Sequence, residues 1–396
     1  MLDLRGTSVT WGSGSVTITG DSVRDSKSDI LSDAGEGQVF ITGAQFKDFI
    51  DTDATSESPS KTKLTLGSGG VLFADGTISG DIDAKVFTTS EAVGKVYFSG
   101  EGTFMTNGAL SIAVAETDTD GVLALGEGTI DAQSINLTNK SIDTKNQGDL
   151  AKDIFTVSGG HLVVNSGLTS TNSVVEFKAA SASGASLSLD SEANNQGGLV
   201  NTNLKFSTDK TSLKVLQGQW ALAEGKDVYF AGGANFSVGA EADEYAINDA
   251  TASLSLDNLN VKGTTASTVA EGGSLTVNTM QAGEGAVFTV NGQFTINGRE
   301  GIDGSAASTE IDEVKKADDT FGIDLAKAKF TVSGPEAQLK FGQVATDLVT
   351  ISGGELTGNA KSTVEVNKAL GDAVINLEDH GMLYLDFDSG TTITAQ

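Results

Sequence analysis

The sequence of 396 residues predicts an all-β fold, an elongated parallel β-solenoid (β-helix), and three observations lead to this prediction. Apolar and small polar residues alternate over runs of four or five residues, which is the period of a strand with one buried face. A glycine or an asparagine closes many of these runs and supplies a turn. Only 6% of the residues are aromatic and 49 are glycines, so small side chains must fill a thin core that neighbouring coils bury.

The alternating runs recur along the whole chain and are rich in Val, Ile, Phe and Thr, the residues that strands favour. Runs closed by glycine or asparagine occupy residues 16–19, 39–42, 155–158, 288–291, 294–297, 330–333 and 349–352. Further strands are expected at residues 186–189, 204–206, 254–256, 275–277 and 383–385. The spacing of about ten to twenty residues is typical of coils that each contribute short strands to a stack.

The alternative architecture is a set of tandem β-sandwiches, each of about 100 residues. Sandwich domains usually contain a buried tryptophan and are joined by proline-rich linkers, but the chain has only Trp11 and Trp220, and only Pro59 and Pro335. We therefore expect a single elongated domain over residues 1–396. Coils that rise about 4.8 Å each would build a rod of about 95 Å from about twenty coils.

Two segments break the alternating pattern. Residues 44–62 combine a Phe- and Ile-containing stretch with a polar run around Pro59, and residues 299–328 contain helix formers at helical spacing. We expect each segment to be an insertion between coils, with short helices above all in residues 299–328. Insertions of this kind occupy a face or an end of a solenoid, where contacts with partners are common.

The charge balance excludes several partners. The chain has 53 acidic and 25 basic residues, a net charge of −28, and its arginines are Arg5, Arg24 and Arg299. A nucleic acid needs a basic surface, so it is not expected as a partner, and an anionic membrane would be repelled in the same way. Divalent cations such as Ca²⁺ take carboxylate ligands and would screen this charge.

Cysteine is absent, which removes disulfides, thiolate catalysis and cysteine-ligated metals. Proteins that cross an envelope unfolded often avoid cysteine, so its absence fits an exported chain. No apolar run approaches the length of a membrane-spanning helix, and the first residues lack the pattern of a signal peptide. These observations fit a leader already removed, an export signal outside this sequence, or a phage-type protein that is never exported.

Catalytic constellations are missing from the sequence, so no enzyme is expected. Nucleophilic catalysis needs a base beside the nucleophile, and the histidines, His161 and His380, lie far apart in the sequence. There is no glycine-rich phosphate loop before a helix and no dinucleotide fingerprint. The many acids could serve a glycan-cleaving solenoid, but they are scattered in turns, where Asp bonds locally. We assign no catalytic or cofactor-binding residue.

Two acidic clusters resemble the beginning of a calcium loop, in which alternate carboxylates precede a glycine. They are residues 116–121, and Asp48 with Asp51 and Asp53. Neither has a glutamate at the spacing of an EF-hand, so solvated turn acids are the favoured interpretation and no metal ligand is assigned. Asn136 and Asn235 begin glycosylation tripeptides, which are frequent by chance in a chain rich in Ser and Thr.

The phrase Val-Ser-Gly-Gly-x-Leu-x-Val at residues 157–164, and the related residues 351–356, resemble the passenger repeats of bacterial autotransporters and of filamentous-haemagglutinin-like adhesins. The resemblance extends loosely over most of the chain and implies a right-handed β-solenoid that projects from the cell. The repeat length here is irregular, unlike that of these families. The acidic, cysteine-free composition, with 4 methionines and 2 histidines, also resembles that of surface-layer proteins.

These observations predict a non-catalytic structural protein, secreted or displayed on a bacterial outer surface, that mediates adhesion, self-association or biofilm matrix formation. Its expected partners are copies of itself and surface glycans or proteins. The alternative is a self-assembling subunit of a surface layer, sheath or filament that divalent cations order. A third hypothesis is a phage fibre component.

Overall fold

The fold was analysed in a computed structural model, in which all the described elements are β-strands. The residues that it describes are 2–3, 14–18, 38–42, 62–66, 71–75, 87–89, 95–98, 102–114, 121–139, 154–171, 174–180, 183–191, 196–239, 252–262, 266–283, 285–296, 323–324, 329–333, 338–341, 349–350, 355–359, 363–366, 374–377 and 382–385. Within these ranges there is no helix, and hence none that could cross a membrane.

The chain divides into two compact units, Met1–Ser188 and Leu189–Gln396. The strands of the first unit are β1 (Leu2–Asp3), β2 (Gly14–Ile18), β3 (Gln38–Thr42), β4 (Thr62–Leu66), β5 (Val71–Asp75), β6 (Phe87–Thr89), β7 (Lys95–Phe98), β8 (Thr103–Val114), β9 (Gly121–Asn139), β10 (Ile154–Thr171) and β11 (Val174–Lys178). Strand β12 (Ala185–Asp190) contains the boundary between the units.

The second unit continues with β13 (Gln196–Asn201), β14 (Leu204–Phe206), β15 (Thr211–Leu222), β16 (Asp227–Phe230), β17 (Asn235–Val238), β18 (Ala252–Val261), β19 (Ala266–Val269), β20 (Gly273–Ala282), β21 (Val287–Val290) and β22 (Gln293–Ile296). It ends with β23 (Ile323–Asp324), β24 (Lys329–Ser333), β25 (Gln338–Phe341), β26 (Val349–Thr350), β27 (Glu355–Asn359), β28 (Thr363–Val366), β29 (Val374–Leu377) and β30 (Met382–Leu385).

Three long strands, β8, β9 and β10, form the centre of the first unit, and they pair in parallel with shifts of register where they bend. Phe104, Ile130 and Leu162 occupy one row across the three strands and are fully buried. Alternation along each strand therefore sends one side chain of every two into the core, as the sequence pattern predicts. Strands β6 and β7 are antiparallel, whereas every other strand pair with a described register is parallel.

Glycines place the first bend of β10. Gly159 and Gly160 have φ values of +71° and +66°, which side chains with a Cβ rarely adopt. A Cβ on Gly160 would also lie 2.5 Å from the carbonyl oxygen of Gly128. The predicted turn after residue 158 is thus confirmed as a bend, and the strand continues beyond it.

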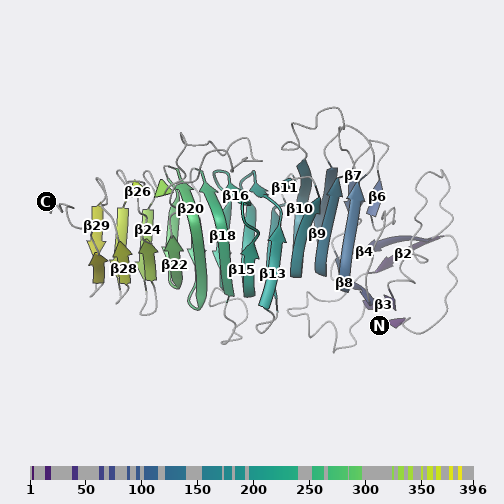
Figure 1. Cartoon of the computed structure of the whole chain (residues 1–396). Helices are drawn as coiled ribbons and strands as arrows, with labels where there is room; N and C mark the ends of the chain where they lie inside the picture. The colour runs from purple at the N-terminus through teal and green to yellow at the C-terminus, as the bar shows by residue number, and fades with distance from the viewer. Residues whose placement is uncertain are drawn as a thin grey trace. The chain divides into compact units, whose positions relative to one another are not determined.

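In the second unit the strands pair in three parallel ladders, which we name after their side chains. The threonine ladder contains the first part of β15, then β17, β19, β21, β24, β27 and β29. The amide ladder contains β14, β16, the second parts of β18 and β20, β23 and β26. The serine ladder contains β13, the second part of β15, the first parts of β18 and β20, β22, β25, β28 and β30. Figure 1 shows these strands following one another from teal to yellow.

Aromatic side chains fill the interior of the second unit. Phe206 and Phe230 are paired in register and their rings stack with centroids 4.7 Å apart. Phe288 and Phe330 repeat this arrangement at the same distance, and Phe236 lies between the two pairs. The two stacked pairs belong to the amide and threonine ladders, and Phe236 contacts a ring of each, so these rings form one continuous part of the core.

The all-β prediction is confirmed for the described residues, and each predicted run lies wholly or partly in a strand. The pairs with a described register are parallel except β6 with β7, whereas the strands of sandwich domains are antiparallel. The insertion at residues 44–62 lies outside the described residues except Thr62, which begins β4. Most of the segment 299–328 also lies outside them. Its residues Ile323–Asp324 form β23, in register with Met280 and Gln281, and the short helices expected elsewhere in the segment stay a prediction.

Candidate functional site: a hydrogen-bonded amide ladder

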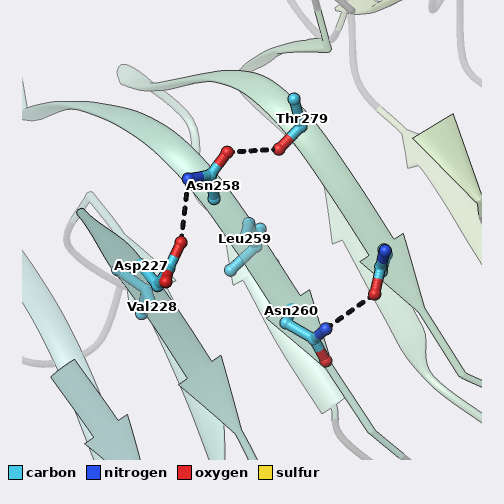
Figure 2. A pocket seen from close by; sticks show the side chains of 7 residues that line it. Asp227, Val228, Asn258, Leu259, Asn260 and Thr279 are labelled. Atoms are coloured by element: carbon cyan, nitrogen blue, oxygen red, sulfur yellow. Dashed lines mark hydrogen bonds between the residues drawn. The ribbon is translucent and has the colours of Figure 1, made fainter. Parts of the chain in front are cut away.

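The amide ladder carries the most developed polar structure in the described part of the chain. Asp227, Asn258 and Thr279 lie at equivalent positions of β16, β18 and β20. The Asn258 Nδ2–H donates to Asp227 Oδ1 at 2.8 Å, and the Thr279 hydroxyl donates to Asn258 Oδ1 at 2.6 Å. Figure 2 shows this chain of bonds crossing three strands. Both functional atoms of Asn258 are therefore used within the protein.

A second row lies two residues further along the same strands. Tyr229, Asn260 and Gln281 are in register, and the Asn260 Nδ2–H donates to Gln281 Oε1 at 2.9 Å. The Lys262 ammonium lies 5.4 Å from the centroid of the Tyr229 ring, within the range of a cation–π contact. Tyr229 is buried, so its ring acts as part of the packed surface and is not an open platform for a ligand.

Side chains also hold the corner where the serine ladder passes into the amide ladder. Asp257 accepts hydrogen bonds from the Gly225 backbone N–H at 2.8 Å and from Asn278 Nδ2 at 2.9 Å. Just before β14, Asn203 Oδ1 accepts from the Asp227 backbone N–H at 2.8 Å. These acids and amides replace the backbone bonds that a bend interrupts, so they fix the corner.

The rows line a shallow hollow. Its lining residues are Asp227, Val228, Asn258, Leu259, Asn260, Thr279 and Gln281. The open space of about 220 Å³ includes solvent outside the hollow, so the enclosed part is far smaller. Asp227 and Thr279 are 3% and 2% exposed. The arrangement can thus hold strands together and present amide groups at its surface, but it offers no deep pocket to a substrate.

The structure places one of the two histidines. His161 is exposed on β10, and its Nδ1 lies 2.7 Å from Ser186 Oγ. The sequence analysis did not pair these residues, because 25 positions separate them. His380 lies outside the described residues. The prediction that no catalytic constellation is present stays a prediction.

The acidic clusters of the sequence analysis cannot be followed in the structure. Asp48, Asp51, Asp53 and residues 116–120 lie outside the described ranges, and Gly121 begins β9. In the described residues no three potential metal-ligating side chains gather. Asn136 lies within β9, where its Oδ1 accepts a bond from the Thr169 hydroxyl at 3.3 Å, and Asn235 begins β17.

Comparison of the chain with protein-family models, with curated proteins and with solved structures finds no match. Its function is therefore argued from its own residues.

The amide ladder is absent from the sequence-based predictions, although a signal for it exists. Residues 253–261 read Ser-Leu-Ser-Leu-Asp-Asn-Leu-Asn-Val, and residues 274–282 read Ser-Leu-Thr-Val-Asn-Thr-Met-Gln-Ala. The polar and apolar positions coincide over nine residues at a separation of 21, the separation of the bonded residues Asn258 and Thr279. An aligned repeat of this length would have shown which amide side chains are neighbours.

Proposed function

We propose that this chain is a non-catalytic structural protein that acts at a bacterial cell surface or in an extracellular matrix, through adhesion or self-association. Its fold in this proposal is a parallel β-solenoid, in which each coil gives one strand to each of three ladders. The single observation that supports the proposal best is the set of three parallel ladders in the second unit, whose outward rows carry amide and hydroxyl groups.

Two further features support a structural role. The polar side chains that are buried deepest in the amide ladder bind other side chains, as Thr279 does, or bind backbone groups, as Asn203 does. Such bonds stabilise a scaffold and leave little reactive capacity. The hollow on this ladder is also shallow and open to solvent.

Negative-stain electron microscopy of the purified chain tests the proposal, with millimolar calcium and with a chelator. Isolated elongated particles in both conditions, followed by binding to cells, glycans or immobilised copies of the chain, are the expected result. Compact particles would contradict the solenoid. Turnover of a polysaccharide or an ester substrate would contradict the non-catalytic role.

The alternative is a lattice or filament subunit ordered by divalent cations, as in a surface layer or a sheath. The net charge of −28 favours it, because such a charge keeps copies apart until cations screen it. Sheets or filaments that form with calcium and dissolve with chelator would favour this alternative. A stable trimer in solution would instead favour a phage fibre.

A further inference from the structure

The outward side chains of the serine ladder are uncharged over five strands. β13, the second part of β15, the first parts of β18 and β20, and β22 contain no Asp, Glu, Lys or Arg at residues 196–201, 218–222, 252–256, 273–277 and 293–296. This is unusual for a chain in which 20% of the residues are charged. These five strands are therefore uncharged in a strongly acidic protein, and charged residues enter the ladder only further on, at Lys340 of β25 and Glu365 of β28.

Two rows make up this face. The first row is Gln219, Ser253, Ser274 and Gln293. The second row is Ala221, Ser255, Thr276 and Thr295. Every one of these side chains is exposed or half-buried. We call these eight residues the serine face.

The hydroxyl groups of the serine face are available to a partner. Hydroxyl side chains that face each other on adjacent strands can form cross-strand hydrogen bonds. Among the residues that the structure describes, no side-chain hydrogen bond joins members of the two rows.

We infer that the serine face is a contact surface for a second copy of this chain; this inference rests on the self-association in the proposed function. The reason is electrostatic. With a net charge of −28, two copies repel wherever their acidic turns meet, and like charges brought together in an interface cost several-fold to many-fold in affinity. Two copies that meet through the serine face bring no carboxylates of that face together, because none of its eight residues is acidic.

The chemistry of the face also fits a copy of itself. Serine and glutamine both donate and accept hydrogen bonds, so one row can pair with the same row of a second molecule related by a two-fold axis. Small side chains let two sheets approach to about 10 Å. A glycan is less favoured, because none of the eight side chains is aromatic and sugar rings could not stack on the face.

The contact is weak for a single pair and strong for many pairs. The four strands of the serine face, about 4.8 Å apart and each about four residues long, cover only about 250 Å², less than the roughly 800 Å² per partner of a stable complex. Many copies on two opposing surfaces add their contacts, and avidity can then exceed a single affinity by 10²–10⁴-fold, as an order of magnitude. This is the behaviour expected of an adhesive surface protein.

The inference is tested by coating beads with the full chain and measuring bead clustering from about 10 mM to about 1 M salt, over which the screening length falls from about 30 Å to about 3 Å. We expect clustering to increase with salt, because screening removes the repulsion between copies. Ser255→Glu should weaken clustering at least about tenfold, since it places two facing carboxylates in the contact. The matched control is Ser237→Glu, the same substitution on the threonine ladder, which should cluster like the wild type.

Each other outcome overturns the inference. Clustering that is strongest at low salt would show an interface of opposite charges. Loss of clustering with Ser237→Glu and not with Ser255→Glu would assign the contact to the threonine ladder. If the beads cluster only after a glycan is added, or not at all, the self-contact is wrong, whereas elongated particles that bind cells would leave the proposed adhesive function standing. Circular dichroism of both variants, expected to match the wild type, shows that they fold.

Discussion

The amide ladder and the serine ladder share strands β18 and β20, yet their polar side chains behave differently. On one side of the corner at Asp257, Asn258 binds partners on both neighbouring strands. Three residues earlier in the same strand, Ser255 is exposed, and no described side chain of its row is hydrogen-bonded to it. The functional group of the side chain explains the difference. An amide has a separate donor and acceptor, so Asn258 bonds to both neighbouring strands at once, whereas Ser255 makes no such bond along the described part of its row.

The comparison teaches that a polar row on a β-sheet can either stabilise the fold or face a partner. Which of the two it does depends on whether its side chains are hydrogen-bonded to one another along the row. Amide and carboxylate side chains bind along the row and become part of the scaffold. Serine and threonine side chains in register with one another keep their capacity for water or for another molecule. The four predictions below test this distinction and its structural support.

The largest effect is expected for Asn258→Ala. The substitution removes two hydrogen bonds and leaves the buried Asp227 carboxylate and Thr279 hydroxyl without this partner, so it should destabilise the unit by about 2–4 kcal/mol. The measurement is the urea midpoint followed by fluorescence of the buried Trp220. Ser255→Ala on the same strand is the control, and an equal shift for both variants would contradict the comparison.

A second substitution tests the support beneath the serine face. Gly198 is paired with Trp220, and a Cβ on Gly198 would lie 2.5 Å from the indole ring. Gly198→Ala should therefore destabilise by about 1–3 kcal/mol, the usual cost of overpacking. A blue or red shift of the native Trp220 emission would accompany the lower urea midpoint. Gly225→Ala tests only the effect of φ, because no atom lies within 4 Å of a Cβ there.

Strand β20 offers a matched pair on the two sides of the corner. Thr279→Val removes the hydroxyl that donates to Asn258 and should cost about 1–2 kcal/mol. Thr276→Val removes a hydroxyl of the serine face at almost the same volume and should change stability by less than about 0.5 kcal/mol. Thermal unfolding of the two variants beside the wild type gives both values. Equal costs would show that hydroxyl groups on both ladders are equally bound.

The smallest effect is expected at the second row of the amide ladder. Gln281→Ala removes a single hydrogen bond, the one from Asn260, at a half-buried position, so it should cost about 0.5–1.5 kcal/mol. The double-mutant cycle with Asn260→Ala isolates this bond. A coupling energy near zero would mean that this bond contributes nothing to stability, unlike the bonds in the row of Asp227, Asn258 and Thr279.

The local pattern of the sequence predicted the strands well and the site poorly. Runs such as residues 288–291 and 330–333 alternate so regularly that their buried side chains, Phe288 and Phe330, could be assigned from period alone. The structure shows that these two rings stack. The pairing of the runs, however, depends on the residues that connect them. The number of these connecting residues differs from one pair of strands to the next.

The amide ladder shows why the pairing register of the strands could not be predicted from the pattern within each strand. Asn258 lies 31 residues from Asp227 on one side and 21 from Thr279 on the other, so no fixed period brings the three together. Gly292 is a similar case. It follows a predicted strand, but it is needed because a Cβ would lie 2.3 Å from the Ala270 and Gly273 carbonyl oxygens, a contact that only the fold creates.

Unequal spacing between paired residues has a consequence for the use of this molecule as a material. Strand pairing is kept whether 21 or 31 residues separate two partners, so foreign peptides grafted between strands need not disturb the stack. The entropy of closing a longer loop rises by only about 0.6 kcal/mol for each doubling of its length. Peptide epitopes or mineral-binding segments inserted after Val238, where β17 ends, would be displayed at a spacing that the ladders set.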